Sequence, residues 1–109
     1  MQIPNCPFTV TDWSRVPATE HAGTTGLALW RTLEIGDVRI RLVEYSPGYL
    51  ADHWCERGHI LYVVEGELQT ELQGLETVTL RPGMSYEVSD HRSSHRSSTK
   101  TGAKLFIVD

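Results

Sequence analysis

The sequence has few cysteines, no long apolar run and no cluster of basic residues. No apolar stretch approaches the roughly 18 residues that a membrane-spanning helix needs, so we expect no membrane partner. The chain carries 10 lysines and arginines against 14 aspartates and glutamates, a formal net charge of −4, and this mild acidic excess argues against nucleic acid as a partner. The first residues contain neither a basic nor an apolar segment, and only two cysteines are present. We therefore expect no secretion signal, free thiols and a cytoplasmic protein.

The length and composition predict one globular domain. A chain of 109 residues, of which 39% are hydrophobic, can build one core and leaves little room for a second domain. Residues 1–26 are rich in Pro, Thr and Gly and show no period, so we expect an irregular N-terminal arm with a short helical turn near residues 11–15. Residues 27–109 show no amphipathic helical pattern longer than a turn.

From residue 27 onward, short alternating runs are separated by turn signals, which is typical of an all-β sandwich or barrel. The pattern predicts a tight turn at residues 35–38 and a hairpin whose three-residue loop is 56–58. It also predicts a strand over residues 59–65 and a last hairpin formed by residues 95–99 and 104–108. Eight or nine short strands of this kind close most readily as a barrel, because closure limits exposed edges.

The most informative segment lies around the expected loop 56–58. His53 and Cys55 are two residues apart on a predicted strand, so their side chains point to the same face, whereas Asp52 and Trp54 point to the other. In the expected hairpin Cys55 lies opposite His59, with Cβ atoms about 4.5–5.5 Å apart. One metal ion with bonds of roughly 2.0–2.3 Å could then reach His53, Cys55 and His59.

The types of donor in this group indicate the kind of ion. Thiolate and imidazole ligands suit Zn, Ni, Cu or Fe better than Mg or Ca, so the pattern predicts one divalent transition metal. A fourth ligand must come from another segment. His91 and His95 are the nearby candidates, and His21 lies in the arm.

This segment resembles the first motif of the cupins, which has a Gly, a His-x-His pair, a Glu about four residues later and then a Gly. Gly48, His53, Cys55, His59 and Gly66 occupy that pattern. Cys55 stands in place of the second His and His59 in place of the Glu, and Gly48 is one residue closer to His53 than the pattern has it. The exchange preserves the ligand charge but makes the site softer, which favours Zn, Ni or Cu over Mn, with Fe(II) still allowed.

The resemblance extends to the second cupin motif and covers residues 27–109. Gly83 matches its start and His95 its end, with one residue more than usual, and Ser89-Asp90-His91 stands where Pro-x-Gly is expected. The resemblance thus favours His95 as the fourth ligand and keeps His91 as its rival. The tetrapeptide 52–55 is similar to that of the DHCW-motif cupin-fold proteins, with Trp and Cys in reverse order.

The resemblance implies a single-domain cupin jelly roll with one metal ion held by His53, Cys55, His59 and His95. We expect a metal-dependent enzyme that acts on a small organic molecule by Lewis-acid or O₂ chemistry. The alternative is a non-catalytic module that binds a metal or a small ligand, because four protein ligands that include a thiolate resemble a closed structural site. No general acid or base stands out, so the catalytic residues are unknown and the sequence leaves open whether the chain is an enzyme.

Both faces of the strand 59–65 are apolar. His59, Leu61 and Val63 share the metal side, while Ile60, Tyr62 and Val64 form the other face, to which we expect Trp54 to belong. Because a sheet face in water normally reads as polar, something must cover this second face. The arm 1–26 and a second subunit are the two candidates, and we expect a homodimer.

Overall fold

The computed structural model describes residues 2–109, so that Met1 of the predicted arm lies outside it. Over this range the chain is built of antiparallel strands, and none of its helices is long and apolar enough to cross a membrane. The elements are η1, a 3₁₀-helix (Trp13–Arg15), and the strands β1 (Ala18–Ala22), β2 (Leu27–Ile35), β3 (Val38–Tyr45), β4 (His59–Gly66), β5 (Leu68–Leu72), β6 (Thr77–Leu80), β7 (Ser85–Val88), β8 (His95–Ser98) and β9 (Ala103–Val108).

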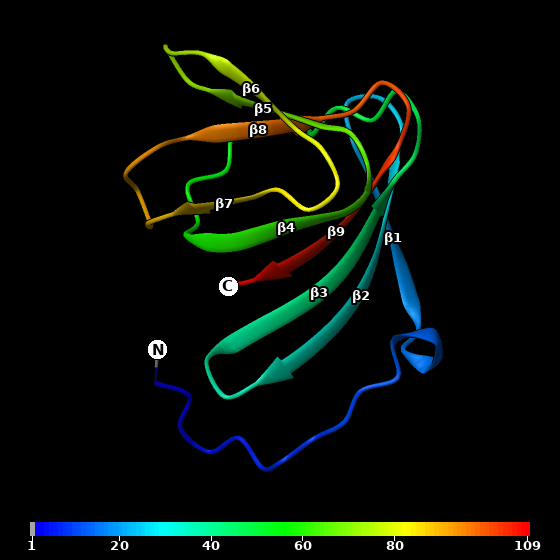
Figure 1. The fold of residues 1–109 in the computed structure, drawn as a ribbon, viewed down its shortest axis with the longest axis vertical. Coiled ribbons are helices and arrows are strands. Elements are labelled where there is room, and N and C mark those ends of the chain that lie inside the picture. The colour runs from blue at the N-terminus through cyan, green and yellow to red at the C-terminus, as the bar shows by residue number, and fades with distance from the viewer. Residues whose placement is uncertain (1) are drawn as a thin grey trace.

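The strands form a six-stranded sheet in the order β1-β2-β3-β9-β4-β7 and a three-stranded sheet in the order β6-β5-β8. From β4 onward the chain passes repeatedly between them, since β5 and β6 lie in the small sheet, β7 in the large, β8 in the small and β9 in the large (Figure 1). Strands that are close in sequence thus face each other across the interior. This topology confirms the predicted all-β jelly roll.

The hydrophobic core lies between the two sheets. Its buried members come from both, and they are Val43, Leu61, Val63, Leu68, Leu80, Ala103, Leu105 and Ile107. Leu61 and Val63 face inward from β4, as the alternation predicts. At Gly66 the chain leaves the large sheet with φ of 78°, and a Cβ there would collide with the carbonyl oxygen of Gly102, so this crossing requires glycine.

Two local predictions hold and one is wrong. Ile35 pairs with Val38 across a two-residue turn in which Gly36 has a φ of 57°, and η1 lies within the expected helical turn. The last hairpin does not form, because β8 pairs with β5 in the small sheet whereas β9 pairs with β3 and β4 in the large sheet. The structure also contains β1, an edge strand that pairs with β2. Its residues are mostly exposed, so its sequence shows no hydrophobic alternation from which the strand could be predicted.

A buried carboxylate ties the end of β9 to β3. The side chain of Asp109 is 1% exposed and receives two hydrogen bonds from Arg39, at 2.9 and 3.0 Å, and one from Arg41 at 3.0 Å. Burial by itself would raise the pKa of Asp109, but its interactions with His59 and Arg39 and the positive charges of Arg41 and Arg39 hold that pKa well below its usual range. Asp109 is therefore ionised and serves as a shared counter-ion.

The outer face of the large sheet is apolar and only partly covered. The arm segment 6–13 and Leu33, Ile35, Ile40 and Phe106 line one shallow groove, where the Trp13 ring packs edge-on against Phe106 with centroids 6.1 Å apart. On β4, however, Ile60, Tyr62 and Val64 remain 43%, 46% and 40% exposed. The arm thus covers the β2–β3 side of this face and leaves the β4 side open.

Replacing Asp109 with Asn should lower the free energy of unfolding by about 3 kcal/mol, because it leaves buried guanidinium groups without their counter-ion. Urea unfolding followed by tryptophan fluorescence measures the change. Asp37→Asn, in the exposed β2–β3 turn, is the matched control and should stay within about 0.5 kcal/mol of the wild type. Equal unfolding midpoints for the two variants would contradict the role given to Asp109.

We propose that a second copy of the chain covers the exposed β4 face, because the arm does not reach it and three large apolar side chains stay exposed there. Light scattering at micromolar concentration should give twice the chain mass. Tyr62→Glu should give the monomer, since a carboxylate would be buried without a partner, whereas Leu75→Glu, on the exposed β5–β6 turn, should leave the dimer intact. A monomeric wild type would exclude this interface.

Candidate metal centre

The fold brings His95 next to Cys55 and His59, which lie four residues apart in the sequence. His59 begins β4 and His95 begins β8, so they belong to different sheets. Cys55 lies in the segment before β4 and pairs with His95 through two backbone hydrogen bonds of 2.7 and 3.0 Å. The segment 51–58 therefore runs beside β8, and its sulfur is held over the space between the two imidazoles.

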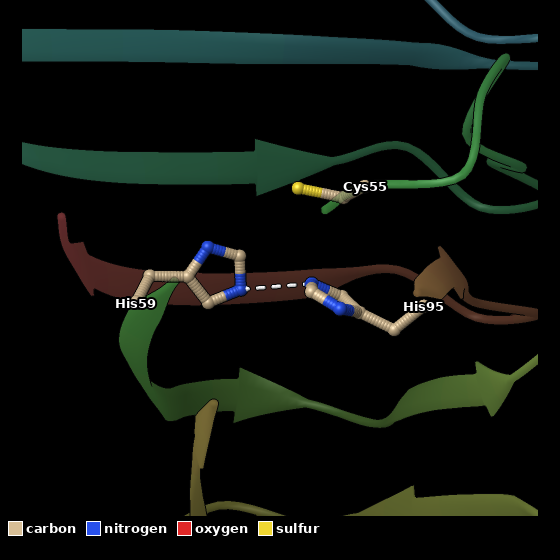
Figure 2. Close-up of side chains that lie close together, drawn as sticks. All are labelled: Cys55, His59 and His95. Carbon is tan, nitrogen blue, oxygen red and sulfur yellow. Dashed lines mark hydrogen bonds between the residues drawn. The ribbon is translucent and has the colours of Figure 1, made fainter. Parts of the chain in front are cut away.

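The donor atoms of these residues lie within 4.8 Å of one another. Figure 2 shows the thiol and the two rings pointing into the same space. The Nε2 atoms of His59 and His95 are 3.1 Å apart, which is close to the roughly 3.4 Å that separates two nitrogens bound to one tetrahedral Zn²⁺ at 2.0–2.1 Å. The arrangement therefore fits a single small ion with little movement.

The surroundings fix the rings in an orientation suited to metal binding. Nδ1 of His95 lies 2.9 Å from the carbonyl oxygen of Ser93, and because a carbonyl only accepts, Nδ1 carries the proton and Nε2 presents its lone pair to the site. Nδ1 of His59 is buried without a hydrogen-bond partner among the described residues, and the nearest acidic oxygen, Oδ2 of Asp109, is 3.8 Å away. A carboxylate behind a ligating imidazole is a common arrangement in metal sites.

The electrostatics favour a thiolate at Cys55. The neighbouring His95 imidazole is the main cause that lowers the pKa of the Cys55 thiol, against the opposing effect of burial. The same interaction with Cys55 raises the pKa of His95. The thiolate is the form of cysteine that binds metals, so Cys55 already favours the charge state that a metal ligand needs.

The structure does not bring His53 into this cluster. Its side chain is 72% exposed, and its Nδ1 lies 2.7 Å from Asp52, although it lines the same cavity as the cluster. His91, the rival of His95, is 80% exposed and lies 3.8 Å from Glu56, and His21 stacks on Trp30 with ring centroids 3.8 Å apart. Of the predicted ligands, Cys55, His59 and His95 therefore converge, whereas the role of His53 stays a prediction.

The expected hairpin at 56–58 is wrong, although two of its residues still meet. Cys55 pairs with His95 and not with His59, because residues 56–58 lead from the edge of the small sheet to β4. The backbone amide of Gly58 donates to Asp90 at 2.6 Å, which anchors this passage. Trp54 was predicted on the outer face of β4, but it lines the cavity. The Arg96 guanidinium lies 4.7 Å from the centroid of its ring.

The cluster forms part of the wall of a cavity of about 460 Å³. Besides the ligand candidates, the wall contains aromatic and charged side chains. These include Trp30, Tyr45, Tyr49, Trp54 and Tyr86, together with Arg39, Arg41, Glu56, Arg57 and Asp109. Pockets of this size hold small organic molecules.

Sequence reasoning did not assign a function to Asp109 or Tyr86. The hydroxyl of Tyr86 lies 2.9 Å from Nε2 of His59, and burial raises the pKa of Tyr86 above its ordinary value. The pairing of β4 with β7 and β9 places both residues beside His59. No local spacing signals this, because all three segments are distant in sequence.

No protein-family model matches the sequence, and no curated protein matches it either. Solved structures do resemble it. A predicted oxalate decarboxylase from Thermotoga maritima has a TM-score of 0.78 at 17% identity, over 92% of this chain and 96% of that one. An RmlC-like cupin from Shewanella frigidimarina has a TM-score of 0.74 at 20% identity, over 94% and 89% of the two chains.

Ectoine synthase from P. lautus has a TM-score of 0.73 at 22% identity, over 93% of this chain and 76% of the synthase. At these identities the likeness concerns the fold, and it agrees with the strand order and the two-sheet topology found here. The chain therefore has the fold of a small single-domain cupin.

Proposed function

We propose that this chain binds one divalent transition metal ion through Cys55, His59 and His95 and that it is a metal-dependent enzyme acting on a small organic molecule in the adjoining cavity. The observation that carries the proposal is the convergence of three donor atoms within 4.8 Å on the wall of that cavity. One thiolate and two imidazoles form a soft to borderline ligand set, which suits Zn, Ni, Fe or Cu.

Three protein donors are the number found in catalytic zinc sites, where the remaining position is open to water or substrate. The alternative is a non-catalytic binding module whose metal is structural, and such a site needs a fourth protein ligand. His53 is the candidate because it lines the same cavity. To bind, however, it would have to leave Asp52 and give up its exposed position, and this favours the open site.

When bound, the ion would supply Lewis acidity that polarises an oxygen of the bound molecule. The residues around it would orient that molecule. The Tyr86 hydroxyl keeps its proton at neutral pH because burial raises its pKa. Once Nε2 of His59 serves as a ligand, this hydroxyl can donate a hydrogen bond to a molecule in the cavity, and the carboxylate of Asp109 can orient Nδ1 of His59 from behind.

The wild-type chain, purified without added metal, should contain about one transition-metal ion per chain by elemental analysis. Cys55→Ser and His95→Ala should each lose most of this metal, since each removes one of three donors, and should melt at a lower temperature. His91→Ala is the matched control for a nearby imidazole and should keep its metal. Full metal content in Cys55→Ser would show that the ligand assignment is wrong.

The coordination of the bound ion separates the enzyme from the structural module. X-ray absorption on the wild type and on His53→Ala should show the same protein ligands, with an additional light-atom ligand that small molecules displace. If His53→Ala instead loses one imidazole and most of its metal, the site has four protein ligands and the non-catalytic alternative is favoured.

A further inference from the structure

Three arginines line the cavity beside the Cys55–His59–His95 cluster. Arg39 and Arg41 come from β3, and Arg57 comes from the segment before β4. The acidic side chains of the cavity are Asp109, which is 1% exposed, and Glu56, which is 62% exposed at the rim. Among these side chains, three guanidinium groups face two carboxylates, in a chain whose formal net charge is −4.

The one buried carboxylate is shared. Asp109 uses both oxygens for Arg39, and it receives a single hydrogen bond from Arg41 and a longer contact of 3.6 Å with Arg57 Nε. Glu56 does not pair with these arginines, because its carboxylate accepts from the Ser94 hydroxyl at 3.2 Å and lies 3.8 Å from His91. The charges of Arg41 and Arg57 are therefore only partly compensated.

Arg41 is the most deeply buried of the three. It is 6% exposed, and its Nε is buried without a hydrogen-bond partner among the described residues. Its guanidinium lies 4.4 Å from the centroid of the Trp30 ring, which holds the group in place without satisfying its donors. A buried cationic group with an unused donor is costly. Because Arg41 is part of the cavity wall, an acceptor bound in the cavity would offset part of the cost of burying its charge.

The remaining walls suit the carbon part of a small molecule. Tyr45 and Tyr49 stack with ring centroids 4.0 Å apart, and Leu61 and Ile107 also line the cavity. The cavity thus has a cationic part at Arg41 and Arg57, an apolar part, and the donor cluster. Guanidinium groups recognise carboxylates with directed hydrogen bonds.

We propose that Arg41 and Arg57 form a carboxylate-binding subsite, so that the molecule taken up by this cavity is a small organic anion. The anion would make two contacts, one between its carboxylate and the arginines and one between its reacting part and the Cys55–His59–His95 cluster. Only the second contact rests on the proposed function, which this inference deepens. The carboxylate contact itself requires only the arginines.

Calorimetry with succinate and the uncharged succinamide tests the subsite, on protein as purified and after loading with zinc. The wild type should bind succinate about tenfold more tightly than succinamide, because only succinate can form charge-assisted hydrogen bonds. Arg41→Gln should abolish this preference. Arg57→Gln, at a side chain that is 53% exposed, should weaken it and keeps the test valid if Arg41→Gln fails to fold.

Arg81→Gln is the matched control, since it removes one positive charge from an exposed arginine outside the cavity and should leave the preference unchanged. Equal binding of succinate and succinamide by the wild type, or an unchanged preference in Arg57→Gln, would overturn the subsite even if zinc binds. A preference for succinate in a chain that binds neither zinc nor nickel, iron or copper would support the subsite and reject the proposed metal function.

Discussion

Two backbone hydrogen bonds between Cys55 and His95 hold the segment before β4 against the first residue of β8. They place a sulfur atom beside an imidazole from the small sheet, while the crossing strands place a second imidazole, from the large sheet, 3.1 Å away. The segment 51–58 is anchored at Ala51, Glu56 and Gly58 as well, but these two bonds are the ones that flank the thiol and hold it facing the cavity. The candidate centre thus depends on backbone pairing, which tolerates changes in the neighbouring side chains.

The site is also coupled to the rigid part of the sheet through charge. Asp109 follows β9 and contacts guanidinium groups from β3 and from the 51–58 segment as well as His59. The same carboxylate that ties β9 to β3 therefore stands behind a candidate metal ligand. Removing it would disturb packing and site together, so effects on metal binding must be compared with effects on folding before a direct role is inferred.

The sequence predicted much of the fold because its information is local. Alternation identified β4 and its inward residues Leu61 and Val63, and the Gly36 turn fixed the register of β2 and β3. Alternation could not identify which strands pair, because it tells which face a residue occupies but not which strand lies beside it. For this reason the pairing of β8 was wrong, and Cys55 was expected opposite His59 when its partner is His95.

A second limit of the sequence pattern concerns which face of β3 points into the interior. Val38, Ile40 and Leu42 alternate with arginines, a pattern that normally places the apolar side in a core. In the structure Arg41 and Val43 are the buried residues of this strand, and Ile40 faces the groove beside the arm. The pattern is inverted because the interior at this point is a cavity with polar walls, while the outer face is covered by the arm.

The inverted pattern of β3, which places Arg41 in the interior, also indicates which class of molecule the cavity binds. A fold that needed only stability would fill this space with apolar side chains, because a buried ion pair contributes less to stability than well-packed hydrophobic residues of similar volume. Here the chain keeps Arg41 buried, with an Nε that has no partner among the described residues, in the wall of the same cavity as a thiol whose pKa is lowered. One thiolate and two neutral imidazoles reduce the charge of a divalent ion to about one positive unit. The ion and the arginine wall would therefore attract the same class of molecule, and an anion bridging them would satisfy both.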